Sequence, residues 1–345
     1  MTFVEAIKEG FRLVNRNWQL VLIQIGMVFI SAIGAFIIVG LPLAIAFIIF
    51  GIDLTGLTDV RDLMATLRGP SEILSRYLGL VLIILTSILL YVLLVALLGI
   101  YIFGGSIGII GRSLSERSMK FQMSTFFGEA KRLFLRLLGF TSVIGVISIV
   151  AFFSLGILGG GIAALVSFAQ TQDSTLALFF GTFFSLILFV IALFVILGIL
   201  SVALYGMAAL FFKDTGPARS VGEATHYLVR NPNAFWLYAV LFLGYLVAFF
   251  VLILLSYPFT LIPVIGTILS FPYQLISYTI QTYFGLMIIA AIFAYYYSTE
   301  FPGGSSVQTG PPAGGTDSEP SGQGEGTQVS VEDSTAEDIL TRPSE

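Results

Sequence analysis

Six apolar stretches, each long enough to cross a lipid bilayer, constrain this chain more than any other feature. A spanning helix needs about 20 predominantly apolar residues, because its backbone N–H and C=O groups must bond to each other within the hydrocarbon. Only 10% of the 345 residues are charged, whereas soluble domains carry about 25%. The sequence therefore predicts an all-α polytopic membrane protein with six transmembrane helices. The predicted spans are Gln19–Phe50, Leu78–Phe103, Phe140–Phe168, Leu176–Phe212, Phe235–Tyr257 and Pro272–Tyr297.

The links between these spans differ in character. The third and fourth spans are separated only by the polar residues 170–174, which predicts a tight helical hairpin. Pro42 lies inside the first stretch, so this stretch either crosses once with a kink or ends as an interfacial segment. The fifth and sixth spans are joined by an uncharged apolar link that contains Pro258, Pro263 and Gly266. We expect this link to lie in the interface or to re-enter the membrane.

The basic residues predict the orientation, because Lys and Arg concentrate in cytoplasmic flanks. They cluster before the first span, between the second and third, and between the fourth and fifth. The opposite side carries only Arg61, Arg68 and Arg76. We therefore expect a multi-pass protein of the cytoplasmic (inner) membrane with both termini in the cytoplasm. A signal peptide is the alternative for the N-terminus, but the first apolar run is too long for one.

Residues 301–345 form an acidic tail of different composition, rich in Gly, Ser, Pro and Thr. The tail holds eight acidic side chains and one basic side chain, Arg342. Its charge is −7, which leaves +3 on the rest because the whole chain carries −4. We expect a disordered cytoplasmic tail. Its segment from Val329 to Leu340 is either solvated without a role or a short element that folds on a protein partner.

A motif of Glu-Ala, five residues and Arg precedes the first, third and fifth spans. Two copies also share an Asn and the only tryptophans of the chain, Trp18 and Trp236, which predicts membrane-interface anchors. The second span of each pair ends on a Tyr and a Gly. The chain is thus three repeats of an amphipathic helix plus a helical hairpin, at about residues 1–110, 120–213 and 218–300 of the membrane domain 1–300. The motif residues are Glu5, Arg12, Glu129, Arg136, Glu223 and Arg230, and the closing pairs are Tyr101 with Gly104, Tyr205 with Gly206, and Tyr283 with Gly285.

The Glu and Arg of each copy are seven residues apart, which is too far for them to pair within a helix. We therefore hypothesise a cytoplasmic ring of Glu–Arg contacts between repeats that closes the three hairpins into a pseudo-threefold bundle. In the alternative interpretation these six residues line an entrance for lipid headgroups or a substrate. His226, within the third copy, is a partly exposed histidine on an interfacial helix, a pH sensor or a ligand for a lipid headgroup.

The arrangement resembles the glycerophosphoryl diester phosphodiesterase membrane-domain-like family of six-span bacterial and archaeal proteins, most of which have no assigned function. The resemblance covers Met1 to Glu300. It rests on residues 5–12 with Trp18, residues 223–224 with Trp236, and residues 101–105. Some relatives are fused to a phosphodiesterase domain, which implies work near lipids. No such domain occurs in this sequence, so the resemblance implies no catalytic residue.

Several function classes lack the residues that they need. The spans contain no Asp, Glu, Lys, Arg or His for a proton relay. With no Cys and one His we expect no metal site, and without a P-loop or a nucleophile with a base we expect no cofactor and no catalytic residue. The net charge of −4 gives no support for a nucleic-acid partner.

The remaining polar and glycine-rich features predict helix packing. Residues 104–108 and 156–161 are runs rich in glycine, which permits close helix crossing; phosphate binding is the alternative. Gln24, Gln274 and Gln281 are the main polar groups of the spans, and we expect them to form hydrogen bonds between helices.

The expected function is that of a non-enzymatic lipid-contacting scaffold or membrane-homeostasis factor, with membrane lipids as partners. The alternative is a passive permease or exporter component for a small or amphiphilic solute. A lipid-modifying enzyme would need Glu129, Glu223, Arg136, Arg230 and His226 together in one cleft. A packed glycine-lined core favours the scaffold, and a water-wide cavity favours the permease.

Overall fold

The computed structural model describes residues 1–49, 70–116, 121–261 and 263–302. Contacts divide the chain into two units, Met1–Ser306 and Val307–Glu345, and the described residues all lie in the first. Arg61, Arg68 and the predicted disordered tail from residue 303 onward lie outside the described residues.

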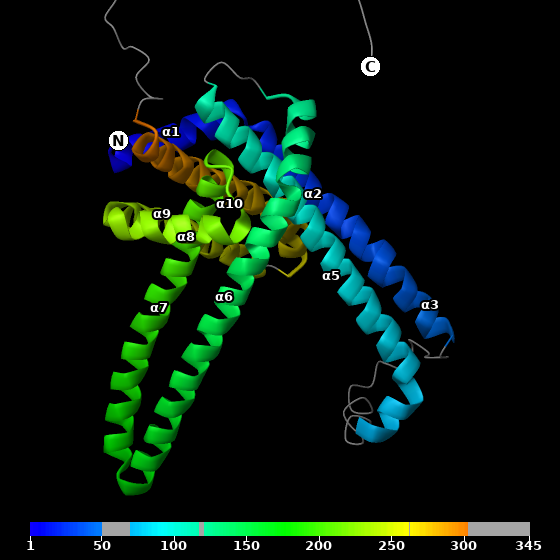
Figure 1. Ribbon diagram of the computed structural model, residues 1–345. Helices are drawn as coiled ribbons and strands as arrows, with labels where there is room; N and C mark the ends of the chain where they lie inside the picture. Colours follow the sequence, from blue (N-terminus) through cyan, green and yellow to red (C-terminus); the bar gives the residue numbers. More distant parts are fainter. Residues whose placement is uncertain (50–69, 117–120, 262, 303–345) are drawn as a thin grey trace, which may run out of the picture. The chain divides into compact units, whose positions relative to one another are not determined.

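The described residues are helical apart from short links, and they contain no strand. Six helical segments are long and apolar enough to cross a membrane, which confirms the six predicted spans and the class of multi-pass membrane protein. Figure 1 labels the helices. They are α1 (Phe3–Arg16), α2 (Gln19–Ala35), the π-helix η1 (Phe36–Gly40), α3 (Leu41–Ile49), α5 (Pro70–Ser115), α6 (Met123–Gln172), α7 (Ser174–Phe212), α8 (Pro217–Arg230), α9 (Pro232–Leu261) and α10 (Pro263–Glu300).

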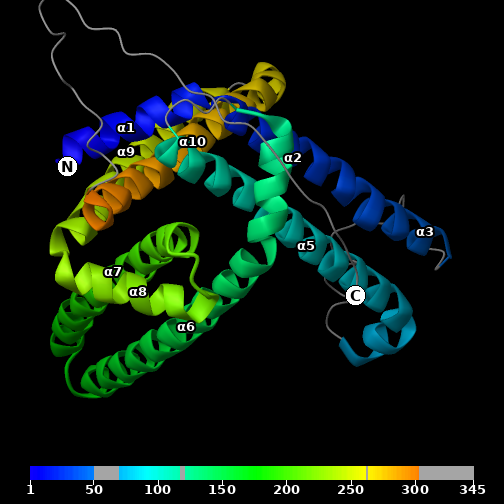
Figure 2. The same ribbon diagram turned by 45° about the horizontal axis from the view of Figure 1, so that its top comes forward.

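Three hairpins extend from a common base and diverge from one another (Figures 1 and 2). The first hairpin pairs α2–η1–α3 with α5, the second pairs α6 with α7, and the third pairs α9 with α10. We call the remainder of each hairpin, away from the base, its arm. The base consists of α1, residues 17–21, α8, and residues 100–115, 123–140, 201–213, 232–241 and 284–300.

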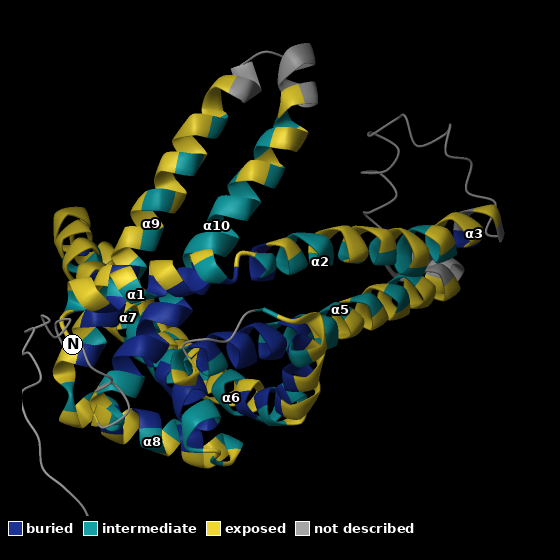
Figure 3. Ribbon diagram, turned by 90° about the horizontal axis from the view of Figure 1, so that it is seen from above, coloured by how far each residue is buried: buried dark blue, intermediate teal, exposed yellow. Residues whose placement is uncertain are grey.

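The core of the protein lies in this base, and the arms are largely exposed (Figure 3). Among the described residues, the buried hydrophobic side chains all belong to the base except Ala46, Ala169 and Ala177. The arms therefore do not form the closed bundle that we hypothesised. Hydrocarbon solvates Leu and Phe as well as another helix does, so apolar helices associate in a bilayer only where close packing or hydrogen bonds favour contact.

The two short amphipathic helices that precede a hairpin, α1 and α8, are called entry helices, and they begin and end at the capping residues of the sequence. In α1, Thr2 and Glu5 form a capping box, and Asn17 ends the helix. Helix α8 begins with Pro217 in its first turn and ends at Asn231, directly before the next helix. Between Met123 and Gln172 there is neither Asn nor Pro, so the second amphipathic segment and the third span form one helix, α6.

Proline shapes the two hairpins that contain it without breaking them. Pro42 has no N–H to donate to the previous turn, and the π-helix Phe36–Gly40 lies just before it. The first stretch nevertheless continues as helix to Ile49, and Gln19–Ala46 is one candidate span. The predicted apolar link between the fifth and sixth spans is mostly helical, because α9 runs through Pro258 to Leu261 and α10 begins at Pro263. Its location in the interface or as a re-entrant segment stays a prediction.

The predicted tight hairpin between the third and fourth spans is confirmed. Asp173 is the single residue between α6 and α7, and its extended backbone ends one helix and starts the next. Its Oδ1 accepts a hydrogen bond of 2.8 Å from the backbone N–H of Thr175. A carboxylate at this position also interacts favourably with the positive end of the α7 dipole.

Candidate functional site

The charged residues singled out by the repeat lie in the base, where the second helix of each hairpin contacts the entry segment of the next repeat. Helix α5 packs on the start of α6, α7 packs on α8, and α10 packs on α1. The contact between α10 and α1 returns from the third repeat to the first. The base is therefore a closed ring of three junctions, as the repeat predicts.

Glycine permits the closest approach in the first junction. A Cβ atom on Gly108 of α5 would lie 2.4 Å from Cβ of Glu129, and one on Gly105 would lie 2.6 Å from the ring of Phe126. The packing interpretation of residues 104–108 is therefore confirmed. It fails for Gly156, Gly160 and Gly161 in the arm of α6, which have no neighbouring atom within 4 Å of the added Cβ.

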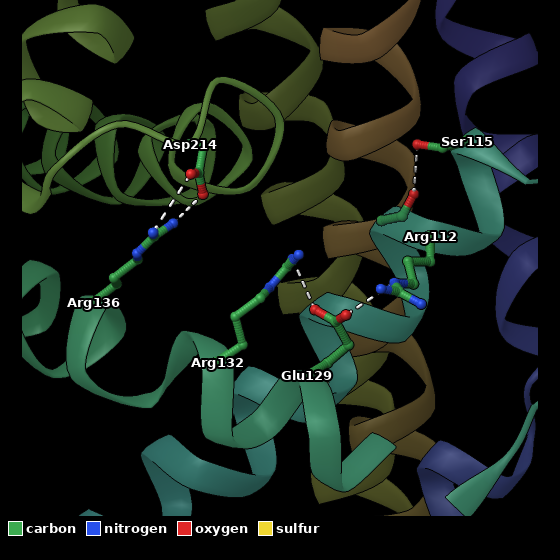
Figure 4. Close-up of polar contacts among 7 residues, drawn as sticks. Arg112, Ser115, Glu129, Arg132, Arg136 and Asp214 are labelled. Carbon is green, nitrogen blue, oxygen red and sulfur yellow. Dashed lines mark hydrogen bonds and ion pairs between the residues drawn. The ribbon is translucent and has the colours of Figure 1, made fainter. Parts of the chain in front are cut away.

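Glu129 is the most buried charged side chain of the first junction, and its residue is 3% exposed. Its carboxylate lies between two arginines (Figure 4). Nε of Arg112, at the end of α5, is 2.8 Å from Oε1, and Nη2 of Arg132, on α6, is 2.8 Å from Oε2. The Arg132 guanidinium also lies 5.5 Å from the centre of the Phe211 ring. These contacts offset the cost of removing the carboxylate from water.

Glu223 occupies the corresponding position in the second junction. It accepts a hydrogen bond of 3.0 Å from Nζ of Lys213, at the end of α7, and Nε of Arg219 lies 4.0 Å from its other oxygen. Lys213 also lies 2.9 Å from Glu300 at the end of α10. Partial burial opposes the charge on Lys213, but its hydrogen bonds to Glu300 and Glu223 outweigh that effect and raise its pKa well above the ordinary range.

Glu5 has a different role in the third junction. Helix α10 ends in an acidic residue, Glu300, so no basic side chain at its end faces Glu5 as Arg112 and Lys213 face the other two. Glu5 instead caps its own helix: Oε2 accepts a 2.7 Å hydrogen bond from the backbone N–H of Thr2. That contact lowers the pKa of the Glu5 carboxyl.

The hypothesised ring of Glu–Arg pairs is therefore wrong in its partners. Arg12 binds Glu9 on its own helix at 2.7 Å, and Arg136 pairs with both carboxylate oxygens of Asp214. Arg230 is exposed and forms no ion pair within the described part of the chain. Arg12 thus pairs with an acid one turn away on its own helix, and Arg136 pairs with an acid in the link between α7 and α8. The sequence signal that we missed is the basic residue at the end of each preceding hairpin, Arg112 or Lys213.

The tyrosine at the end of each hairpin contacts the next repeat in all three junctions, which the motif Glu–Arg pairs do not. Each packs on an aromatic residue of the next entry segment, with ring centroids 5–7 Å apart, the spacing at which aromatic pairs attract. The pairs are Tyr101 with Phe134 at 6.0 Å, Tyr205 with Tyr227 at 5.3 Å, and Tyr283 with Phe11 at 6.1 Å. The hydroxyl of Tyr205 also donates to the carbonyl of Ala234 at 2.9 Å.

The tryptophans and the histidine are exposed. Trp18 lies between α1 and α2, and Trp236 lies in the first turns of α9. Both are thus free to meet lipid, and their role as interface anchors stays a prediction. His226 is exposed on α8. In the parts of the chain that the structure describes, no three or more His, Asp or Glu side chains are grouped to hold a metal ion.

The paired acids predict a loss of stability at low pH. Hydrogen bonding to Lys213 lowers the pKa of Glu223 below its ordinary value of 4.5. This carboxylate therefore stabilises the fold above pH 4.5, and the stabilisation is lost as the pH falls through the lowered pKa. We expect the unfolding midpoint in detergent to fall more steeply below pH 4.5 in the wild type than in Glu223→Gln. The pair is about a third exposed, so the difference should stay below about 1 kcal/mol; equal slopes would contradict the assignment.

Comparisons with protein-family models, with curated proteins and with solved structures found no match to this chain. The fold and the site define the class of this protein: it is an all-α multi-pass membrane protein whose repeats close into a ring at the base.

Proposed function

We propose that this protein is a non-enzymatic, lipid-contacting scaffold of the cytoplasmic membrane. The observation that carries the proposal is the exposure of apolar side chains along every arm. Leu89 on α5, Ile149 on α6 and Phe189 on α7 are 67%, 70% and 65% exposed, and their arms diverge from the base (Figure 1). In a bilayer, lipid chains would fill the spaces between the arms, so the protein would order lipid around a rigid base.

The charges of the base support an orientation toward the cytoplasm. Basic side chains gather at the ends of α1, α5, α7 and α8 and at the start of α6, and the arms have almost no charge. Such a basic face favours contact with the anionic headgroups of the inner leaflet. It agrees with cytoplasmic termini and with the lipid-associated role that the family resemblance implies.

Two other functions are less well supported. A passive permease needs an open path through the repeat ring, but Tyr205, Phe293 and Tyr296 fill the base and are each less than 2% exposed. A lipid-modifying enzyme needs the acids and the histidine in one cleft, but the Glu129 carboxylate is held by two arginines and His226 is exposed on α8. The role of the acidic tail in binding a protein partner stays a second, independent proposal.

A spin-label scan tests the scaffold against the permease. The chain has no cysteine, so single cysteines can be introduced without removing any other. Labels at each position from Ile147 to Phe153 cover every face of α6, because about 3.6 residues make one turn. With the protein in vesicles, we expect oxygen to relax all seven labels and a water-soluble nickel chelate to relax none. A strip of labels that the chelate reaches would indicate an aqueous path and would contradict the scaffold.

A further inference from the structure

The third hairpin carries a stripe of uncharged polar side chains within an otherwise apolar arm. The stripe recurs every three or four residues along one face of α10, the spacing of a single helix face. It consists of Ser270, Tyr273, Gln274, Ser277, Tyr278 and Gln281. We predicted that the glutamines of the spans form hydrogen bonds between helices, and this holds for only some of them. Gln24 donates to Ser106 at 3.4 Å, whereas Gln281 bonds only Ser277 of its own helix.

This polar stripe lines a cavity of about 450 Å³ between α9 and α10, whose opposite wall is Leu252, Ile253 and Ser256. Along α9, Ser256 lies about 30 Å from Trp236 at about 1.5 Å per residue. That distance equals the hydrocarbon thickness of a bilayer, about 30 Å. With Trp236 at one interface, the cavity begins near the opposite interface and extends into the hydrocarbon.

A second cavity, of about 300 Å³, lies on the other side of α10, against α2. Val28, Phe29 and Ala32 of α2 line it, together with Phe271 and Leu275 of α10. The two cavities share Gln274 and Tyr278. A cavity lined by the polar stripe and a mostly apolar cavity therefore meet at these two side chains.

Gln274 and Tyr278 form no hydrogen bond with any described residue. An amide and a hydroxyl without partners are costly in hydrocarbon, where no bulk water replaces the missing bonds. A bound molecule that supplies donors and acceptors at this point would remove that cost. Because none of the described residues that line the two cavities is charged, a charged headgroup would find no counterion among them.

We propose that the third hairpin binds an uncharged amphiphile, a lipid with a hydroxyl- or carbonyl-bearing headgroup of the diacylglycerol type. The lipid headgroup occupies the cavity lined by the polar stripe and forms hydrogen bonds with Gln274 and Tyr278. An acyl chain of the lipid occupies the mostly apolar cavity against α2. The combined site is of the size that small-ligand pockets have. This inference rests on the proposed function in one respect, that lipid surrounds the arms.

Photo-crosslinking in nanodiscs tests the site with the full chain. One probe is a diacylglycerol with a diazirine in one acyl chain, and the other is phosphatidylglycerol with the same chain. We expect diacylglycerol to label peptides from the two cavities about fivefold more than phosphatidylglycerol does, the ratio that one or two net hydrogen bonds provide. Tyr278→Phe, which removes only the hydroxyl, should reduce the ratio, and Gln274→Leu with Tyr278→Phe should bring it to about one.

The matched control is Gln170→Leu, which removes an exposed amide at the far end of α6 and should leave the ratio unchanged. Equal labelling of every arm by both probes would overturn the selective site and leave the lipid-contacting scaffold standing. A ratio that survives the double substitution would also overturn the site. Absence of label from all three arms would overturn the site and the scaffold together.

Discussion

Replacing both Arg112 and Arg132 by alanine should lower the free energy of unfolding by about 3–5 kcal/mol, because Glu129 would remain as a buried charge without a partner. Adding Glu129→Leu to the double variant should recover most of that loss, since a well-packed apolar side chain replaces a buried ion with little penalty. Unfolding by rising SDS in mixed micelles measures all three proteins.

The control for this prediction is the pair Arg12→Ala and Arg230→Ala, two exposed arginines of the repeat motif, which should change stability by less than about 0.5 kcal/mol. If Glu129→Leu fails to recover stability, the arginines act through packing, for example that of Arg132 on Phe211, and the electrostatic explanation is wrong. The same logic predicts that Arg112→Glu rescues Glu129→Arg, whereas Arg12→Glu does not.

Gly10→Val should destabilise the third junction by about 3 kcal/mol, because the new side chain meets backbone that cannot move aside. A Cβ atom at this position lies 2.8 Å from the carbonyl oxygen of Met287 and 2.9 Å from Cβ of Ala291. Helix α1 would have to separate from α10. The midpoint of SDS unfolding and the rate of proteolysis within α1 measure the effect.

Gly222→Val is the matched control, since Gly222 lies on the other short entry helix and an added Cβ there has no neighbour within 4 Å. It should be neutral or slightly stabilising, because valine has a higher helix propensity than glycine. Equal effects of the two substitutions would mean that the approach of α1 to α10 contributes nothing to stability.

The spans could be predicted because a single local property decides them. About 20 apolar residues without charge have to be helical in hydrocarbon, whatever surrounds them. The hairpin at Asp173 was equally local, since its polar residues separate two long apolar runs. The helical character of the link at Pro258 and Pro263 was not foreseen, because proline at a helix start or near a helix end is compatible with helix on both sides.

The partners of the charged residues could not be predicted in the same way. The repeat predicts that three junctions form a ring, and it does, but an identical spacing of Glu and Arg says nothing about which side chains approach. Glu129 reaches Arg112 only because Gly108 lets α5 approach α6 closely. Glu5 has no basic residue opposite it because α10 ends in Glu300.

The sequence by itself determined the helices, the number of spans and the threefold repeat, since each depends on hydrophobicity and spacing along the chain. Only the tertiary structure decided that the arms diverge, that aromatic pairs close the ring and that Gln274 and Tyr278 have no hydrogen-bond partner among the described residues. Those features depend on close approach between helices far apart in the sequence. Apolar helices in lipid have no general drive to associate, so small residues and specific polar contacts decide where they meet.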